Sequence, residues 1–147
     1  MSIAIRPATT DDIPFILNAV HDINIQSGYT EPHYLTEITL AKDVFSEDPA
    51  ASVIIASHDN QSAGFILYSN MYATALGPYL WAVQIFTHPD YRKQGVASKM
   101  LSYLQTHNPK SNAICWAVTA DNKAAQPAFD KITSTKLNDV TFYIMKG

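Results

Sequence analysis

The sequence has almost no cysteine: Cys115 is the single one among 147 residues, so no disulfide can form within the chain. This excludes the small folds that depend on disulfide bridges, and it fits a reducing compartment. Cys115 stands between Ile114 and Trp116 in an expected strand. That setting favours a packed structural thiol over a nucleophile, so we expect no acyl-cysteine intermediate.

The chain also lacks an excess of charge of one sign. Its formal net charge is −3 and its isoelectric point is about 5.9, which gives no long basic surface for a nucleic-acid backbone. It has no uninterrupted apolar run of about 18 residues, and no basic segment with a long apolar run opens it. We therefore expect a soluble, cytoplasmic protein with neither nucleic acid nor a membrane as partner.

The sequence also lacks histidines spaced closely enough to serve together as metal ligands. His21, His58 and His107 are scattered along the chain and do not form the closely spaced set that a metal ion requires. His88 precedes a proline at the end of an expected strand, where a local hydrogen-bonding role is favoured over catalysis. No metal is expected.

Apolar residues are abundant: they make up 47% of the chain, enough for the core of one globular domain over residues 1–147. Their spacing predicts strands over residues 2–6, 51–57, 62–72, 79–87, 112–118 and 140–145. It predicts helices from Thr9 and Thr10 to Gly28, from about His33 to Pro49, from Gly95 to about His107, and briefly after the fifth strand. Gly77-Pro78 is expected to break the chain before the fourth strand. This order predicts an α/β (α+β) fold with a mixed sheet flanked by helices.

The most informative segment follows the fourth strand and opens a helix. It reads Arg92-Lys93-Gln94-Gly95-Val96-Ala97-Ser98. The first turn of a helix has amide hydrogens without intrahelical acceptors, and the helix dipole adds partial positive charge there. A pyrophosphate satisfies both. Gly95 leaves the backbone open to phosphate oxygens, and cations at positions 92, 93 and 99 add charge.

Two other phosphate-binding patterns are absent from this segment. It lacks the second glycine and the Gly-Lys-Ser/Thr ending of nucleotide triphosphatases, and it lacks the three spaced glycines of dinucleotide-binding loops. Nucleotide hydrolysis is therefore not expected. An ordinary capped helix is the simpler alternative for a segment with one glycine and a few cations.

Arg92-x-x-Gly95-x-Ala97, preceded by Ile85-Phe86-Thr87-His88-Pro89-Asp90-Tyr91, resembles the Arg/Gln-x-x-Gly-x-Gly/Ala signature of the GCN5-related N-acetyltransferase (GNAT) family. The opening Ile5-Arg6-Pro7-Ala8-Thr9, the pair Gly64-Phe65 and Asn122-x-x-Ala125 are similar to that family too. The element order resembles it over nearly the whole chain. Within the family, the layout is weakly closest to diamine N-acetyltransferase-like members.

This resemblance implies a mostly antiparallel sheet of six to seven strands, split between the fourth and fifth strands and flanked by about four helices. It implies acetyl-CoA as cosubstrate, with the pantetheine arm in the split and a small-molecule or peptide amine as acceptor. It also suggests a homodimer. The implied binding residues are Ile85, Phe86, Thr87, Arg92, Lys93, Gln94, Gly95, Val96, Ala97, Ser98 and Asn122. The implied catalytic group is a backbone amide of Ile85 or Phe86, which would polarise the thioester carbonyl and can be worth about 3 kcal/mol.

Two usual catalytic positions of the family hold apolar residues here. Phe129 stands where many members have a tyrosine that protonates the departing thiolate, and Val83, beside Gln84, stands where diamine-type enzymes have a carboxylate. A thiol with a pKa of about 8.5 leaves tolerably as its anion, and general acid help is typically worth about 10²–10⁴-fold, so activity would be lowered rather than abolished. Other side chains that could help an amine lose its proton are Glu31, His33, Tyr72, Tyr79 and Asp121.

The end of the chain departs from the family as well. Pro127 argues that the helix there begins near Gln126, which would leave residues 122–125 as a loop. The sequence therefore supports two hypotheses. The first is an N-acetyltransferase that acts by direct attack of an amine, and the second is an acyl-CoA-binding regulatory module with weak or lost catalysis.

Overall fold

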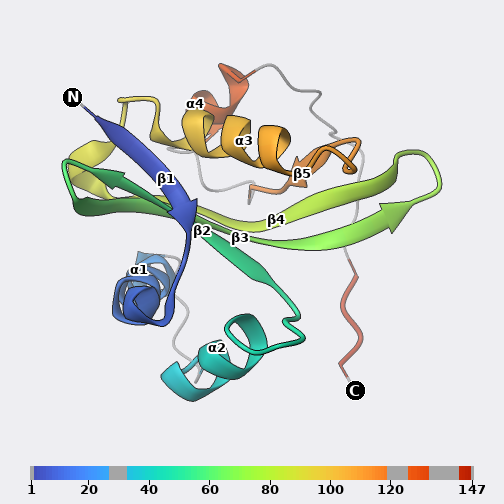
Figure 1. Ribbon diagram of the computed structural model, residues 1–147, viewed down its shortest axis with the longest axis horizontal. Helices are drawn as coiled ribbons and strands as arrows, with labels where there is room; N and C mark the ends of the chain where they lie inside the picture. The colour runs from blue at the N-terminus through green and yellow to red at the C-terminus, as the bar shows by residue number, and fades with distance from the viewer. Residues whose placement is uncertain (1, 27–32, 119–125, 133–142, 147) are drawn as a thin grey trace. The chain divides into compact units, whose positions relative to one another are not determined.

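Figure 1 shows the computed structural model of the chain, which describes residues 2–26, 33–118, 126–132 and 143–146. The chain clusters into two compact units, Met1–Ala117 and Val118–Gly147. The first unit holds the sheet and the longer helices. A single domain over residues 1–147 stays a prediction. Among the described helices, none has the length and apolar character needed to cross a bilayer.

A five-stranded sheet forms the centre of the first unit, in the order β1-β2-β3-β4-β5. Its strands are β1 (Ile3–Pro7), β2 (Ser52–His58), β3 (Gln61–Ala73), β4 (Gly77–Thr87) and β5 (Ile114–Trp116). The first three pairings are antiparallel, and β4 pairs with β5 in parallel. The predicted mixed, mostly antiparallel sheet is therefore confirmed.

The predicted count of six to seven strands is not matched, because the described residues contain five. The strand predicted over residues 140–145 accounts for part of the difference. Residues 140–142 lie outside the described part of the chain, and Tyr143, Ile144 and Met145 are exposed and have no regular secondary structure. Alternating apolar residues form a strand only where a neighbouring edge supplies backbone partners, which sequence periodicity does not report.

Helices cover both faces of the sheet within the first unit. α1 (Ile13–Gln26) and α2 (Glu37–Val44) lie on one face, and α3 (Val96–His107) lies on the other (Figure 1). Two 3-10 turns, η1 (Thr10–Asp12) and η2 (Pro89–Tyr91), precede α1 and α3. The second unit contributes the five-residue α4 (Gln126–Asp130). The described chain thus has three helices of eight residues or more and one short helix, against about four predicted.

Two helix starts show how local chemistry sets the boundaries. α2 begins at Glu37 and not near His33, because Thr36 caps it: the amide of Thr39 donates to the Thr36 hydroxyl at 3.2 Å, and the amide of Thr36 donates to the Thr39 hydroxyl at 2.8 Å. α4 begins at Gln126 with Pro127 in its first turn, where a missing amide hydrogen has little cost. The predicted end of the first helix at Gly28 lies outside the described residues.

The turn before β4 corrects a sequence prediction. Gly77 and Pro78 were expected to break the chain, yet both belong to β4 and pair with β3. Gly77 has a positive φ of 74°, and a side chain there would meet the Nδ2 atom of Asn112, which donates to the Leu76 carbonyl at 2.8 Å. Glycine is needed because of this left-handed conformation at the start of the strand.

One cluster of the core lies on the α1 and α2 face of the sheet, and further buried residues belong to α3, among them Val96, Met100 and Leu104. Buried residues of α1, α2 and the strands pack into one cluster comprising Ile13, Ile16, Ala19, Val20, Leu40, Val53, Ile55, Phe65 and Phe86. The rings of Phe15, Phe65 and Phe86 contact one another with centroids 5.7–6.3 Å apart. Contacting aromatic rings of this kind stabilise the fold by more than the burial of their apolar area alone. Phe86 thus contributes its side chain to the core.

Candidate functional site

The two strands β4 and β5 pair over only part of their length. Leu80, Trp81 and Ala82 of β4 have partners on β5, and residues 83–87 have none on this side among the described residues. The amide of Leu80 donates to the Ala113 carbonyl at 3.0 Å, which anchors the paired end. The separation between the fourth and fifth strands that the resemblance implied is therefore present as an open edge of β4.

A β-bulge lies where this open edge begins. Leu67 of β3 pairs with Gln84 and Tyr68 pairs with Ala82, so Val83 has no counterpart on β3. Val83 is 54% exposed. A bulge adds one residue to a strand and re-aims the residues around it. Val83 occupies the position where the resemblance places a carboxylate in diamine-type enzymes. It lies at the bulge, which separates the paired part of β4 from the open part.

The alternation of the backbone decides which groups face the open edge. A Cβ on Gly64 of β3 would collide with the carbonyl oxygen of Phe86, and the amide of His88 donates to the Ala63 carbonyl of β3 at 2.7 Å. Phe86 and His88 therefore turn their backbone groups toward β3. Successive residues of a strand point these groups to opposite sides. Ile85 and Thr87 consequently present theirs to the open edge.

The loop before α3 has the geometry of an anion-binding helix start. Gly95 is the N-cap with φ 79°, and Lys93 also has a positive φ, of 63°. The amides of Gly95, Val96, Ala97 and Ser98 have no acceptor within the described part of the protein, and the helix ladder starts with the amide of Lys99 donating to Gly95. A side chain at Gly95 would enter open space. These groups can receive a diphosphate.

Cationic side chains surround the loop. Arg92, Lys93 and Lys99 are exposed. The Nε atom of Arg92 donates to the Thr87 carbonyl at 3.1 Å, so Arg92 also ties the loop to the end of β4. Gln94 donates through Nε2 to the Asp90 carbonyl at 3.3 Å. The sequence motif is thereby brought next to the open edge of β4.

His88 has the local role that its sequence position indicated. Its Nδ1 atom accepts from the amide of Asp90 at 3.2 Å, which caps η2. Among the described residues there is no group of three His, Cys, Asp or Glu side chains that would hold a metal ion. Cys115 is half-buried, and burial raises the pKa of its thiol, which disfavours the nucleophilic thiolate.

Several predicted site residues are not brought to this edge by the described structure. Asn122, Glu31 and Asp121 lie outside the described residues. Tyr72 is 73% exposed on the long β3–β4 hairpin. Phe129 lies in α4, in the second unit.

Sequence reasoning missed His58, a residue of β2 that contacts the site loop from another strand. Its ring packs against Tyr91 with centroids 5.1 Å apart. A signal was present in the sequence, since His58 precedes Asp59-Asn60, and these two residues have positive φ as a type I′ hairpin turn requires. Knowing where that hairpin tip lies still required the fold.

Comparison with known proteins places this geometry in context. The model of the acetyltransferase (GNAT) family matches residues 17–133. A thialysine N-ε-acetyltransferase from Sus scrofa is 28% identical over 108 residues, which cover 68% of this chain and 64% of that protein. Its Bos taurus counterpart is 27% identical over 107 residues, covering 67% and 63%. The chain thus spans slightly less than two thirds of these relatives.

Solved structures share the fold at lower identity. An integron cassette protein from V. cholerae superposes with a TM-score of 0.76 at 21% identity, covering 100% of this chain and 94% of that one. An aminoglycoside N-acetyltransferase in complex with CoA superposes with a TM-score of 0.72 at 15% identity, covering 98% and 100%. At these identities the likeness concerns the fold.

Proposed function

Because the chain belongs to the acetyltransferase (GNAT) family, we propose that it binds acetyl-CoA along the open edge of β4 and transfers the acetyl group to a primary amine. The acceptor is the amine of a small molecule or peptide. The observation that carries the proposal is the row of unpartnered amides at residues 95–98, beside a strand edge that continues to Thr87. Four backbone donors and three cations suit a diphosphate.

The open edge of β4 suits the thiol arm in the same way. Ile85 offers one donor and one acceptor, and Thr87 offers its amide, because the Thr87 carbonyl already accepts from Arg92. A pantetheine arm carries amide groups that match this pattern. We propose that it lies beside residues 83–87 and takes the place of the missing strand.

Direct attack then needs few side chains. The neutral amine adds to the thioester carbonyl carbon and the carbonyl oxygen gains negative charge. The nitrogen then gives up one proton to water, the carbonyl re-forms, and the C–S bond breaks to release the thiolate. We assign the amide of Ile85 as the donor to that oxygen, because Phe86 turns its own amide toward β3. A donor placed where charge develops can be worth about 3 kcal/mol.

Proton transfer is the weaker part of this site. An alkyl ammonium has a pKa of about 10.4, so about one molecule in a thousand is neutral at pH 7. Val83 and Gln84 cannot accept its proton, and Phe129 cannot donate one to the thiolate. The enzyme therefore works more slowly than relatives with both groups, which typically add about 10²–10⁴-fold each.

Titration calorimetry with acetyl-CoA tests the binding half of the proposal. Gly95→Glu places a carboxylate among the four amides, and we expect it to weaken binding at least tenfold, about 1.4 kcal/mol. Ser102→Glu is the matched control, because it adds the same charge to the exposed face of α3. Absence of binding by the wild type, or equal binding by Gly95→Glu, refutes the assignment.

Release of free thiol tests the transfer half. The acceptor panel starts with thialysine and lysine, because the curated relatives are thialysine acetyltransferases, and continues with polyamines, aminoglycosides and peptide amino termini. Turnover with any of these acceptors supports the assignment as an N-acetyltransferase. The alternative is an acyl-CoA-binding regulatory module, which Val83 and Phe129 favour. Tight binding without turnover across the panel would select that alternative.

Homodimerisation, the cytoplasmic location and the absence of a metal remain proposals. They follow from the resemblance and from the composition of the chain. Sedimentation of the purified protein would decide the oligomeric state.

A further inference from the structure

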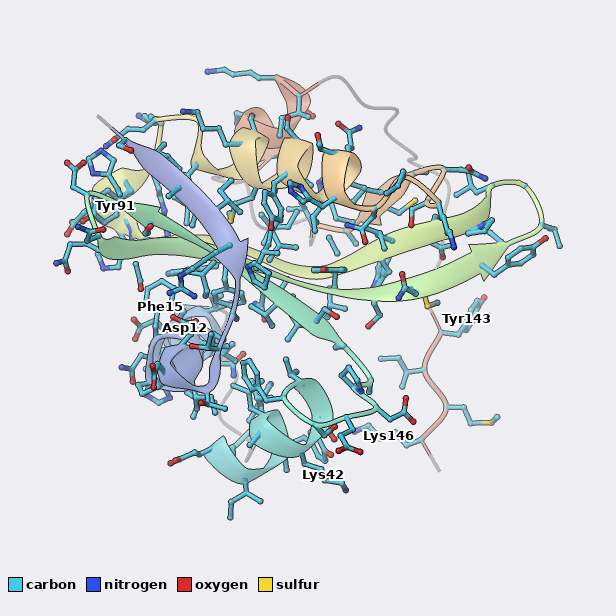
Figure 2. The ribbon with its side chains drawn as sticks, in the orientation of Figure 1. Asp12, Phe15, Lys42, Tyr91, Tyr143 and Lys146 are labelled. Carbon is cyan, nitrogen blue, oxygen red and sulfur yellow. The ribbon has the colours of Figure 1, made fainter. Side chains whose placement is uncertain are left out.

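Tyr91 lies between two histidine rings that come from different parts of the chain. Its ring centroid is 5.1 Å from that of His58 at the end of β2, with 34° between the planes, and 5.9 Å from that of His88 after β4. Figure 2 labels Tyr91 at the end of the sheet where the β2–β3 hairpin meets the loop after β4. The side chain of His58 is only 13% exposed.

Backbone contacts hold the first part of this loop to the sheet. The amide of His88 donates to Ala63 of β3 at 2.7 Å, and the amide of Tyr91 donates to the His88 carbonyl at 2.9 Å. These bonds link η2 to β3. The ring contact with His58 is a separate link, which ties Tyr91 to β2.

The next residues of the loop need such support. Lys93 has φ 63°, a left-handed conformation that a residue with a side chain rarely adopts. Conformations of this kind are unfavourable and persist only where the surroundings enforce them. Lys93 stands two positions after Tyr91 and two before Gly95. A loop that relaxed at Lys93 would turn the amides of residues 95–98 away from a common point.

We propose that His58 and Tyr91 form a positioning pair, in which the histidine ring holds Tyr91 and thereby keeps residues 92–98 in their diphosphate-binding conformation. The inference rests on the proposed function for the identity of the ligand. His58 contacts Tyr91 through its ring, and its buried Nε2 atom has no partner in the described part of the structure. Its Nδ1 atom lies 3.4 Å from the carboxylate of Asp59, which is itself exposed.

If ring packing is what His58 supplies, phenylalanine at position 58 should preserve its role and alanine should not. For His58→Ala and Tyr91→Ala, we expect amide hydrogen exchange at Lys99, whose amide donates to the Gly95 carbonyl of the loop, to quicken about fivefold or more in the ligand-free protein. We expect CoA affinity measured by calorimetry to fall about tenfold. His58→Phe and Tyr91→Phe keep the rings in contact and should match the wild type in both measurements.

Two comparisons separate positioning from general destabilisation. Acetyl-pantetheine lacks the diphosphate, so its affinity, followed by NMR titration, should change less than about twofold in the alanine variants. Tyr103→Ala is the matched control: Tyr103 is also half-buried and stacks on a histidine, His107, at 3.8 Å, but it lies in the later turns of α3. It should lower the melting temperature without altering exchange at Lys99.

Three results would overturn the positioning pair, and a fourth would overturn only the proposed function. Unchanged exchange in His58→Ala, or equal losses of CoA and acetyl-pantetheine affinity, overturns the positioning pair. Faster exchange at Lys99 in His58→Phe as well would show that the nitrogen atoms of His58 matter, which also overturns it. If the wild type fails to bind CoA while exchange responds as expected, the proposed function fails and the positioning pair stands.

Discussion

Arg6 and Asp12 join the first strand to the start of α1. The two nitrogen atoms of Arg6 lie 2.8 and 2.9 Å from the two oxygen atoms of Asp12, and the amide of Thr9 donates to the same carboxylate at 2.8 Å. Asp12, labelled in Figure 2, is buried. The hydrogen bond from Arg6 lowers the pKa of Asp12 below its ordinary value of 3.8, against the opposing effect of burial.

Acid should therefore weaken the fold through Asp12. Because the folded pKa is below 3.8, the stabilisation is fully present above that value and is lost as pH falls through the folded pKa. Asp12→Asn should cost about 1–2 kcal/mol of unfolding free energy at pH 7, since it removes a capping carboxylate paired with a half-exposed arginine. Urea unfolding should show the variant and the wild type converging as the pH falls through the folded pKa of Asp12.

The neighbouring Asp11 provides the control. It is exposed and belongs to the same 3-10 turn. Asp11→Asn should change stability by less than about 0.5 kcal/mol at pH 7. A constant gap between Asp12→Asn and the wild type from pH 7 to pH 2 would contradict the role of the ionised pair.

Sequence spacing predicted the conformation of the loop before α3 better than the direction of the strand amides, and the binding role of both stays a prediction. Gly95 and Arg92 stand three positions apart in the motif. Glycine suits the left-handed N-cap of α3, and Arg92 bonds to the end of β4. The choice between Ile85 and Phe86 depends on which way each amide points. That direction follows from the register with β3, which includes a bulge that no sequence pattern marked.

At the scale of elements, α2 shows how much a short helix depends on its cap. It has eight residues, and one of them, Leu40, is fully buried. Isolated helices of this length are unstable in water, so the reciprocal bonds of Thr36 and Thr39 and the burial of Leu40 have to hold it.

Removing the cap hydroxyl should destabilise this element in particular. We expect Thr36→Ala to cost about 1 kcal/mol in urea unfolding, because the Thr39 amide loses its acceptor. Thr36→Ser keeps the hydroxyl and should stay within about 0.5 kcal/mol of the wild type. Equal losses in both variants would show that the methyl group, and not the cap, is responsible.

At the scale of the whole molecule, ligand binding and folding should be linked. If the diphosphate site exists only in the folded chain, acetyl-CoA at about 100 times its dissociation constant should add about 2.7 kcal/mol to the unfolding free energy. Thermal unfolding followed by calorimetry would show a higher melting temperature. With a tenfold weaker affinity, Gly95→Glu should gain only about 1.4 kcal/mol at the same ligand concentration, whereas Ser102→Glu should keep the full shift; equal shifts in both would place the ligand elsewhere.

The sequence by itself determined the glycine loop before α3, the class of fold and the order of strands and helices through β5, while phosphate binding at that loop stays a prediction. These depend on local chemistry: apolar spacing, capping residues and a glycine where the chain turns left-handed. Only the tertiary structure decided that β4 separates from β5 after Ala82, that Ile85 and Thr87 face the opening, and that His58 supports Tyr91. Each of these depends on strand register and on contacts between distant segments, which local residue preferences do not specify.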